Sequence, residues 1–482
     1  MNLESKLVDK RTLTENELSA WVEMHRAEII ETTQAFLRIP SVGGTAAPGA
    51  PFGVETRQAL DFALSLAESH GLTTKNLDGY AAHAEFSAPG VAATAPIVGA
   101  LAHVDVVPPG TGWSHPPFGA EIESGKIYAR GVLDDKGPAM AALWAILALK
   151  ACAAPLTRRV RLILGANEES GFECVKHYFA HEEMPVTGFT PDAMFPLVHA
   201  EKGIANAVLT HSALPEGERI HLVSLSGGQR PNMVPDTAVA ILKSPTPWAA
   251  IVARLNAVVG VHTEEINGGE HLKIVAQGVS AHGSTPDAGV NAVGVLCDAL
   301  LLLDHHEDQV AVVQQMHTWA EDTTGAALGI AGQDEVTGPL TCNLGVAELG
   351  DGQVSLTFNI RYPVTWNSED LRKRLVTGIA SSGWTLTSLT DQPPLYVPLD
   401  DPLVTTLLEV YRAETGDQTA PMTMGGGTYA RAMANGIAFG PEFRDRDPLD
   451  GGPHEKDECW PVEHLIRATK IYAKALARLA SL

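Results

Sequence analysis

The stretch PIVGALAHVDVVPPG, residues 96–110, decides the fold. Its first half is a short apolar run with β-branched residues, and a Pro-Pro-Gly turn ends it, which is typical of a buried strand that leads into a loop. His103 and Asp105 stand at the exit of this predicted strand. The stretch RVRLILGANEES, residues 159–170, repeats the pattern with two glutamates at its exit. The sequence therefore predicts two buried strands that end in polar loops.

A helix is expected between these two strands. Residues 138–150, PAMAALWAILALK, are rich in Ala and Leu and begin with Pro, which is favoured in the first turn of a helix. Strand, helix and strand in this order favour an α/β sheet with short connections. In such sheets functional residues gather at the carboxyl ends of the strands, where the polar loop residues fall.

The rest of the chain divides into two kinds of sequence. Apolar positions recur every three to four residues over residues 13–37, which predicts an amphipathic helix. Strand-like segments are expected at 220–242, 271–277 and 354–362, and helices at 291–303, 368–380, 401–416 and 461–482. We therefore expect a first domain of residues 1–204 and 392–482, interrupted by an inserted α+β domain of residues 205–391.

The composition excludes several classes of partner. The 482 residues suffice for two or three domains. Thirty-four Lys and Arg residues against 57 Asp and Glu residues give a net charge of −23, which repels nucleic acid and anionic membranes. No secretory signal is visible, and no apolar run is long enough to span a bilayer. The five cysteines have no paired spacing and predict free thiols, so we expect a cytoplasmic protein.

Five loop segments contain the residue types that bind divalent metals. They hold His103 with Asp105, Asp134 with Asp135, Glu168 with Glu169, Asp192, and His454. Two histidines and several carboxylates suit a pair of Zn²⁺, Mn²⁺ or Co²⁺ ions that share a carboxylate and activate a water between them. Taken singly, the segments have simpler explanations: Asp134-Asp135 could cap a helix, and Glu168-Glu169 could be a solvated acidic turn.

Six motifs are more specific when they are taken together and in order. They are HVDVVPPG, ARGVLDDKGP, ANEESGF, TPDAMFP, VSAHGSTPDAGVNA and GGPHEKDE, which begin at residues 103, 129, 166, 190, 279 and 451. They resemble the motifs of the M20 metallopeptidases, especially the bacterial dipeptidases of the PepV type, and the resemblance covers nearly the whole chain. It implies an α/β catalytic domain of the zinc-peptidase type with a mixed central sheet, and an inserted α+β lid domain.

The resemblance also implies two divalent metal ions per chain, zinc or alternatively manganese or cobalt. Five side chains would bind them: Asp134 as the bridge, His103 and Asp192 at one site, and Glu169 and His454 at the other. Asp105 would accept the second imidazole N–H of His103 and fix the tautomer of the ring. In the alternative interpretation Asp105 is only a polar residue at a strand end.

Two more side chains would take part in catalysis by the same resemblance. Glu168 would be the general base, which takes a proton from the attacking water and delivers it to the leaving amine. His282 would reach over the cleft and stabilise the tetrahedral oxyanion, although a His in such a segment could also be a surface turn residue.

Four residues would bind the substrate. They are Asn232 in GGQRPNMVPD, Arg361 in NIRYP, and Gly426 and Gly427 in TMGGGTYAR. Arg361 would hold a substrate carboxylate through a bidentate pair, unless it is an ordinary strand-surface arginine. The glycines would let the substrate backbone approach closely, unless they form a plain turn.

We expect hydrolysis of the amide bond of dipeptides, with a small peptide as substrate. The chain would act as a monomer, since the resemblance implies an insert large enough to close its own cleft. The alternative is a deacylase of N-acyl amino acids, like acetylornithine deacetylase or succinyl-diaminopimelate desuccinylase, which would use the same metals and Glu168. A third hypothesis, a catalytically dead relative that only binds, is disfavoured by the complete ligand set.

Overall fold

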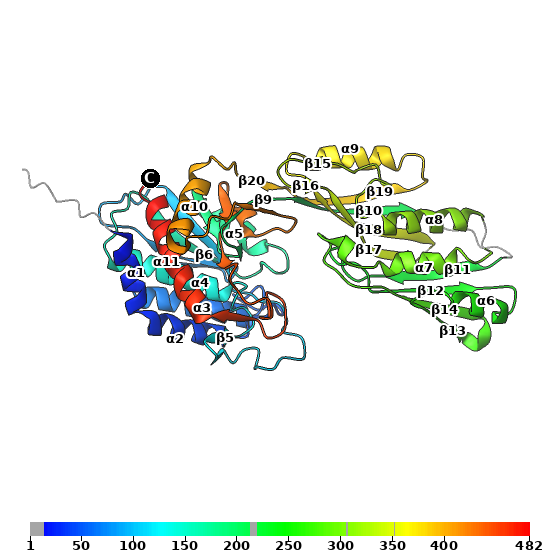
Figure 1. Cartoon of the computed structure of the whole chain (residues 1–482), viewed down its shortest axis with the longest axis horizontal. Helices are drawn as coiled ribbons and strands as arrows, with labels where there is room; N and C mark the ends of the chain where they lie inside the picture. The colour runs from blue at the N-terminus through cyan, green and yellow to red at the C-terminus, as the bar shows by residue number, and fades with distance from the viewer. Residues whose placement is uncertain (1–13, 213–218, 305–306, 351) are drawn as a thin grey trace, which may run out of the picture. The chain divides into compact units, whose positions relative to one another are not determined.

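The computed structural model describes residues 14–212, 219–304, 307–350 and 352–482, which form two compact units (Figure 1). Unit 1 comprises the chain up to His199 together with Val397–Met422 and Thr428–Leu482. Unit 2 comprises Ala200–Tyr396 and Thr423–Gly427. The short segment Thr423–Gly427 thus belongs to unit 2 although its neighbours on both sides belong to unit 1.

A mixed sheet forms the centre of unit 1. Its strands lie in the order β1 (Thr73–Leu77), β2 (Ala81–Phe86), β6 (Arg159–Gly165), β3 (Ile97–His103), β7 (Thr187–Thr190) and β22 (Gly436–Ala438). β3 runs parallel to β6 and β7, whereas β2 is antiparallel to β1 and β6. β3 and β6 are buried along their whole length, which explains their largely apolar sequences. The two predicted buried strands are confirmed.

Shorter strands complete unit 1. β4 (Glu121–Glu123), β5 (Lys126–Tyr128) and β24 (Cys459–Pro461) form a small sheet, and β8 (Ala193–Met194) pairs with β23 (Pro441–Glu442). The chain passes between the units in β9 (Val198–Glu201), β20 (Leu395–Tyr396) and β21 (Met422–Met424), of which the last two pair with β9.

Helices pack against the central sheet of unit 1. α4 (Lys136–Ala151) contacts β3 and β6, and α1 (Glu15–Met24), α2 (Arg26–Leu37) and α11 (Val462–Leu479) contact α4. Because α4 has neighbours on every side, it is apolar all round and buried over most of its length. α3 (Val54–Ser69) and α10 (Pro402–Thr415) join the same core, while α5 (Glu173–His181) packs in a separate cluster with Leu101 and Ile163. The predicted helix at 138–150 is therefore confirmed.

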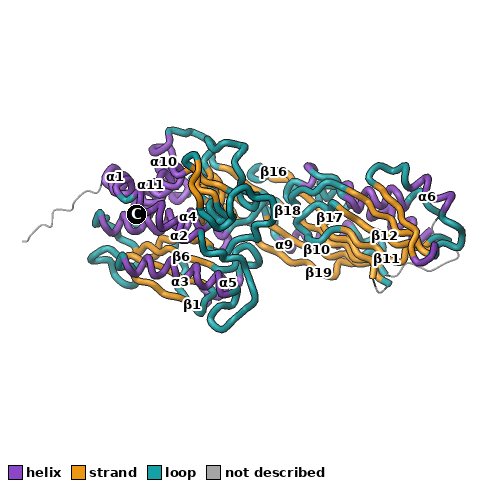
Figure 2. The backbone as a smooth tube through the Cα atoms, turned by 90° about the horizontal axis from the view of Figure 1, so that it is seen from below, coloured by secondary structure: helices purple, strands orange, loops and turns teal. Residues whose placement is uncertain are grey.

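Unit 2 is an antiparallel sheet covered by helices (Figure 2). Its strands lie in the order β13 (Val261–Ile266), β14 (His271–Gln277), β12 (Thr237–Lys243), β11 (His221–Gly227), β17 (Thr341–Gly350), β18 (Gln353–Tyr362), β10 (Gly203–His211) and β19 (Thr385–Gln392). The helices are α6 (Ala249–Leu255), α7 (Ala292–Leu300), α8 (Glu307–Glu321) and α9 (Ser368–Gly378). Alternate residues of β12 are buried in the core that these helices share, as expected for a sheet covered on one face.

Two predicted elements differ from the structure in detail. The helix expected over residues 13–37 is divided into α1 and α2, because His25 has φ −97° and ψ 13° and its ring N–H donates to the carbonyl oxygen of Trp21. Residue 13 lies outside the described part. The strand-like run 220–242 is two strands, because Gly228 with φ +72° and two prolines form a loop between β11 and β12.

Within the described part of the chain, no helix is both long and apolar enough to cross a membrane.

Candidate metal centre

The candidate ligands of unit 1 follow the carboxyl ends of three neighbouring strands. His103 is the last residue of β3, Glu168 and Glu169 come shortly after β6, and Asp192 comes shortly after β7. Because β3 is parallel to both neighbours, these ends meet at one edge of the sheet. The prediction that polar residues gather there is confirmed.

Asp134 lies between two histidines. His103 Nε2 donates to Asp134 Oδ1 at 2.9 Å, and His454 Nε2 lies 3.1 Å from Asp134 Oδ2. His454 Nε2 also donates to Glu169 Oε1 at 3.2 Å, and His103 Nε2 lies 3.9 Å from Asp192 Oδ2. Ligand atoms of His103, Asp134 and Glu169 all lie within 4.8 Å of one another. The structure thus brings all five predicted metal ligands together.

Several carboxylates lie close together in this largely buried cluster, so their negative charges repel one another. The His103 side chain has no exposure, and Asp134, Asp192 and Glu169 expose 14%, 15% and 12% of theirs. Burial and the neighbouring Asp134 raise the pKa of Asp192 well above its usual value, and burial likewise raises the pKa of Glu168. Such crowded carboxylates favour a bound cation, so the residues fit a divalent metal in both chemistry and spacing.

The two histidines are tied to the carboxylates. Burial alone would lower the pKa of His103, but its hydrogen bonds to Asp105 and Asp134 raise the pKa well above the usual value. Hydrogen bonds to Asp134 and Glu169 raise the pKa of His454 to about 10. His454 is 55% exposed in its side chain, so the cluster is open to solvent on this side.

Asp105 holds the loop that carries both glutamates. Its carboxylate oxygens accept hydrogen bonds from the backbone N–H groups of Glu168, at 3.0 Å, and Glu169, at 3.1 Å. His103 Nδ1 donates to the backbone carbonyl oxygen of Asp105 at 2.9 Å, while the Asp105 carboxylate lies 3.6 Å from the same nitrogen. We predicted the Asp105 carboxylate as the acceptor of the His103 N–H, whereas in the structure the backbone carbonyl of Asp105 accepts it. The bonds of the carboxylate to the glutamate loop were not predicted.

Asp135 and Lys136 are buried directly after Asp134. Asp135 is the N-cap residue of α4 but makes no side-chain capping bond, and its Oδ2 accepts the backbone N–H of His103 at 3.1 Å. Lys136 donates to the carbonyl oxygen of Ile39 at 2.7 Å, and burial lowers the pKa of its amine to about 7. These contacts connect the Asp134 segment to β3 and to the chain after α2.

Sequence reasoning missed Glu458. Its carboxylate is fully buried and accepts the side-chain N–H of Arg130 and the backbone N–H groups of Gly131, Leu133 and Asp134. The sequence feature that could have indicated a buried carboxylate is the position of Glu458, at the end of the GGPHEKDE motif and directly before the apolar residues Cys459 and Trp460. A charged side chain beside such a run is rarely buried unless it has partners.

The substrate-binding candidates all lie in unit 2. His282 and Asn232 are exposed. The backbone carbonyl of Asn232 accepts the N–H of Gly283 at 2.7 Å, and Met233 forms a β-bridge with His282. His282 Nδ1 lies 2.6 Å from Ser284 Oγ. The loop of Asn232 and the segment of His282 are therefore directly joined.

Arg361 and the glycine loop approach the same segment. Arg361 is only 4% exposed, and its guanidinium donates to Asn359 Oδ1 at 2.8 Å and to the carbonyl oxygen of Gly425 at 2.9 Å. A Cβ atom added at Gly425 would lie 3.1 Å from Ser284 Cβ, so the glycine allows a close approach. Unit 2 thus brings His282, Arg361 and the loop of Gly426 and Gly427 into one neighbourhood.

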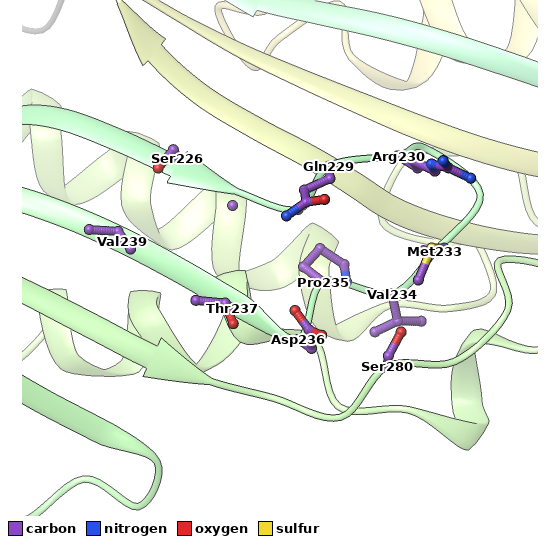
Figure 3. Close-up of a pocket in the computed structure, with 12 residues that line it drawn as sticks. Ser226, Gln229, Arg230, Met233, Val234, Pro235, Asp236, Thr237, Val239 and Ser280 are labelled. Atoms are coloured by element: carbon purple, nitrogen blue, oxygen red, sulfur yellow. The ribbon is translucent and has the colours of Figure 1, made fainter. Parts of the chain in front are cut away.

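A cavity of about 570 Å³ adjoins the Asn232 loop (Figure 3). Gln229, Arg230, Met233 and Asp236 line it from the loop, Thr237 from the first position of β12, and Ser280 from the segment before His282. The lining is mixed in polarity.

The chain is similar to known proteins in both sequence and structure. Residues 99–478 match the model of "Peptidase family M20/M25/M40". The Bacillus subtilis (strain 168) protein named "Putative dipeptidase YtjP" is 42% identical over 465 residues, which cover 94% of this chain and 98% of that protein. A dipeptidase-named protein of Staphylococcus haemolyticus is 34% identical over 95% of this chain and 98% of its own length.

Solved structures share the fold at low sequence identity. Human carnosine dipeptidase 1 has a TM-score of 0.56 and 15% identity, and covers 98% of this chain and 100% of its own. The di-peptidase Dug1p from Saccharomyces cerevisiae has a TM-score of 0.55 and 13% identity, with coverages of 97% and 99%.

The mixed α/β fold and the histidine–carboxylate cluster at the strand ends define a hydrolytic enzyme of the peptidase class. The extent of the family match and the identity to full-length relatives show that the chain belongs to peptidase family M20. The family inferred from the six motifs is confirmed.

Proposed function

We propose that this enzyme hydrolyses the amide bond of dipeptides and depends on two divalent metal ions. The observation that carries the proposal is the position of Asp134, which presents one carboxylate oxygen to each of two histidines. A carboxylate shared in this way is what a two-metal site requires. The names of the sequence relatives support a dipeptide as the substrate.

The ligands would divide around Asp134. His103 and Asp192 lie on the side of Oδ1, and Glu169 and His454 on the side of Oδ2. Imidazole and carboxylate ligands would accept zinc, and also manganese or cobalt. Bound here, two such ions would lower the pKa of a shared water and polarise the substrate carbonyl.

Glu168 would move the proton. Its side chain is partly buried next to the proposed ligand Glu169, and Asp105 accepts its backbone N–H. In this position the carboxylate would accept a proton from the attacking water and deliver it to the leaving amine nitrogen. Glu168 and Glu169 thus have separate tasks, proton transfer and metal binding, although they are adjacent.

Unit 2 would recognise the substrate and act as the lid. His282 would donate a hydrogen bond to the developing oxyanion, and Arg361 would bind the terminal carboxylate of the dipeptide. Asn232, Gly426 and Gly427 would contact the substrate backbone. We further propose a cytoplasmic monomer, on the basis of the cysteine pattern and the size of the insert.

The test is a panel of free dipeptides, tripeptides and N-acetyl amino acids, assayed after chelation and after readdition of Zn²⁺ or Mn²⁺. Hydrolysis restricted to dipeptides and restored by metal is the expected result. Cleavage of the acetylated compounds alone would instead identify a deacylase, which would use the same ligands and Glu168. Activity that survives exhaustive chelation would contradict the metal-dependent mechanism.

A further inference from the structure

The carboxylate of Glu458 is fully buried and bonded to a single short segment of chain. Oε2 accepts from Arg130 Nη1 at 2.7 Å and from the N–H of Gly131 at 2.9 Å. Oε1 accepts from the N–H of Leu133 at 2.8 Å and from the N–H of Asp134 at 3.2 Å. Each oxygen therefore has two donors, and the segment that receives this carboxylate ends in the proposed bridging ligand.

Burying the Glu458 carboxylate destabilises the fold unless each of its hydrogen bonds is formed. A buried carboxylate is stable only when it is paired with a charge and its lone pairs are filled by donors. Arg130 supplies the charge and is itself buried, with 2% of its side chain exposed. The three backbone N–H groups fill the remaining positions and fix the path of residues 131–134 at the same time.

Glu458 also belongs to the segment that carries the second histidine. It lies four residues after His454, whose φ of +63° is rare for a residue other than glycine. The segment is anchored further by the backbone oxygen of Glu458, which accepts the N–H of Ala129, and by Arg446, which donates to the carbonyl oxygen of Asp450. Glu458 thus joins the Asp134 segment to the His454 segment through a single side chain.

We propose that Glu458 is a positioning residue that sets the distance between Asp134 and His454 and thereby the affinity for both metal ions. The inference rests on the proposed two-metal site. Because Asp134 would serve both ions, a shift of its segment weakens both, whereas loss of an ordinary ligand weakens mainly one.

The test variant is Glu458→Gln, which keeps the size of the side chain but replaces one oxygen with an amide NH₂. Whichever oxygen is replaced, the NH₂ then faces two N–H donors. We expect about 10- to 100-fold weaker binding of each of two Zn²⁺ or Mn²⁺ ions, measured by titration of the metal-free full chain against a competing chelator. The absorption spectrum of the Co²⁺-loaded variant should change as well, which a purely structural residue would not cause.

Glu85→Gln is the matched control. Glu85 lies on β2, 14% of its side chain is exposed, and it accepts from Arg161 at 2.7 Å, so this variant also breaks a buried ion pair. Thermal unfolding of both metal-free variants should show similar losses of stability. Only Glu458→Gln should lose metal affinity. Two ions bound by folded Glu458→Gln with wild-type affinity would overturn the inference.

Glu458→Asp keeps the test decisive if the amide variant does not fold. It retains the charge but withdraws the carboxylate by one methylene, so the affinity for both ions should fall by a smaller factor, about 10-fold. Unchanged affinity in a folded aspartate variant would equally overturn the inference. Failure of the proposed function would give a different result. The wild type would then bind two ions but hydrolyse no dipeptide, and the effect of Glu458 on metal affinity would still be observed.

Discussion

The metal-binding candidates of unit 1 and the substrate-binding candidates of unit 2 are held in different ways. In unit 1 the candidate ligands other than His454 are mostly buried, and carboxylates such as Asp105 and Glu458 accept backbone N–H groups of the segments that carry them. In unit 2 His282 and Asn232 are exposed, and a few bonds between neighbouring loops hold them. Rigid support suits ligands whose geometry is fixed, whereas exposed loops suit residues that must meet a changing substrate. The comparison predicts that mutations in the two units separate metal binding from substrate recognition.

Asp134→Ala should have the largest effect. Because both histidines contact this carboxylate, its loss should release or scramble both metals and lower kcat on the order of 1,000-fold or more. Metal content by elemental analysis and dipeptide hydrolysis measure the two effects. As a control, Asp61→Ala removes a half-exposed carboxylate of α3 and should change neither. Wild-type activity in Asp134→Ala would refute the bridging role.

Glu168→Ala should separate catalysis from metal binding within unit 1. It removes the proposed base but none of the proposed ligands, so two metals should remain while kcat falls about 100- to 10,000-fold. The measurement is kcat together with metal stoichiometry. Glu173→Ala, which removes an exposed glutamate of α5, should behave like the wild type. Loss of a metal from Glu168→Ala would show that this residue is a ligand instead.

His282→Ala should have a smaller effect and should leave the metals untouched. Removal of one donor to the oxyanion lowers kcat by about 100- to 1,000-fold, and metal titration should match the wild type because His282 belongs to unit 2. Ser284→Ala, which removes the hydroxyl 2.6 Å from His282 Nδ1, should lower kcat by a smaller factor than His282→Ala. If His282→Ala keeps full activity, unit 2 does not take part in the chemistry.

The smallest expected effect is on the stability of the fold, and it comes from His83, which is not one of the proposed ligands. Burial lowers the pKa of His83 from 6.5 to about 4, and its Nδ1 lies 2.8 Å from the hydroxyl oxygen of Tyr178. The unfolded chain therefore binds a proton more readily between pH 6.5 and 4, so stability falls as the pH drops through this window. We expect a loss of about 2 kcal/mol between pH 7 and 5 from this residue.

Urea unfolding of the wild type and of His83→Gln at pH 7 and 5 measures this contribution. Glutamine does not titrate, so the difference in unfolding free energy between the two pH values should be about 2 kcal/mol smaller in the variant. An identical pH dependence in both proteins would exclude His83 as its source.

The sequence predicted the central part of the fold because local pattern and tertiary structure agree there. The apolar runs that became β3 and β6 have no other stable place than a buried sheet, and their polar exits meet because the strands are parallel. The helix at 13–37 and the strand at 220–242 were predicted as continuous, since periodicity does not reveal where His25 or Gly228 leaves regular geometry.

The candidate site was predictable only in part. Its ligands come from segments that contain metal-binding residue types, and the ordered motifs point to them. The support around them depends on contacts between distant residues: the N–H of Asp134 meets Glu458 across 324 positions of sequence. No local sequence pattern predicts such a contact. For this reason the bonds of Glu458, and those of the Asp105 carboxylate to the glutamate loop, were found only in the structure.

Because of the segment Thr423–Gly427, unit 2 cannot be expressed in full as one continuous stretch of the chain. Unit 2 looks like one continuous insertion, yet Arg361 donates to the carbonyl oxygen of Gly425, which lies beyond the return of the chain to unit 1. A fragment of residues 200–396 expressed alone would leave this guanidinium short of an acceptor in a buried position. A fragment meant to represent unit 2 would therefore need residues 423–427 in addition to residues 200–396.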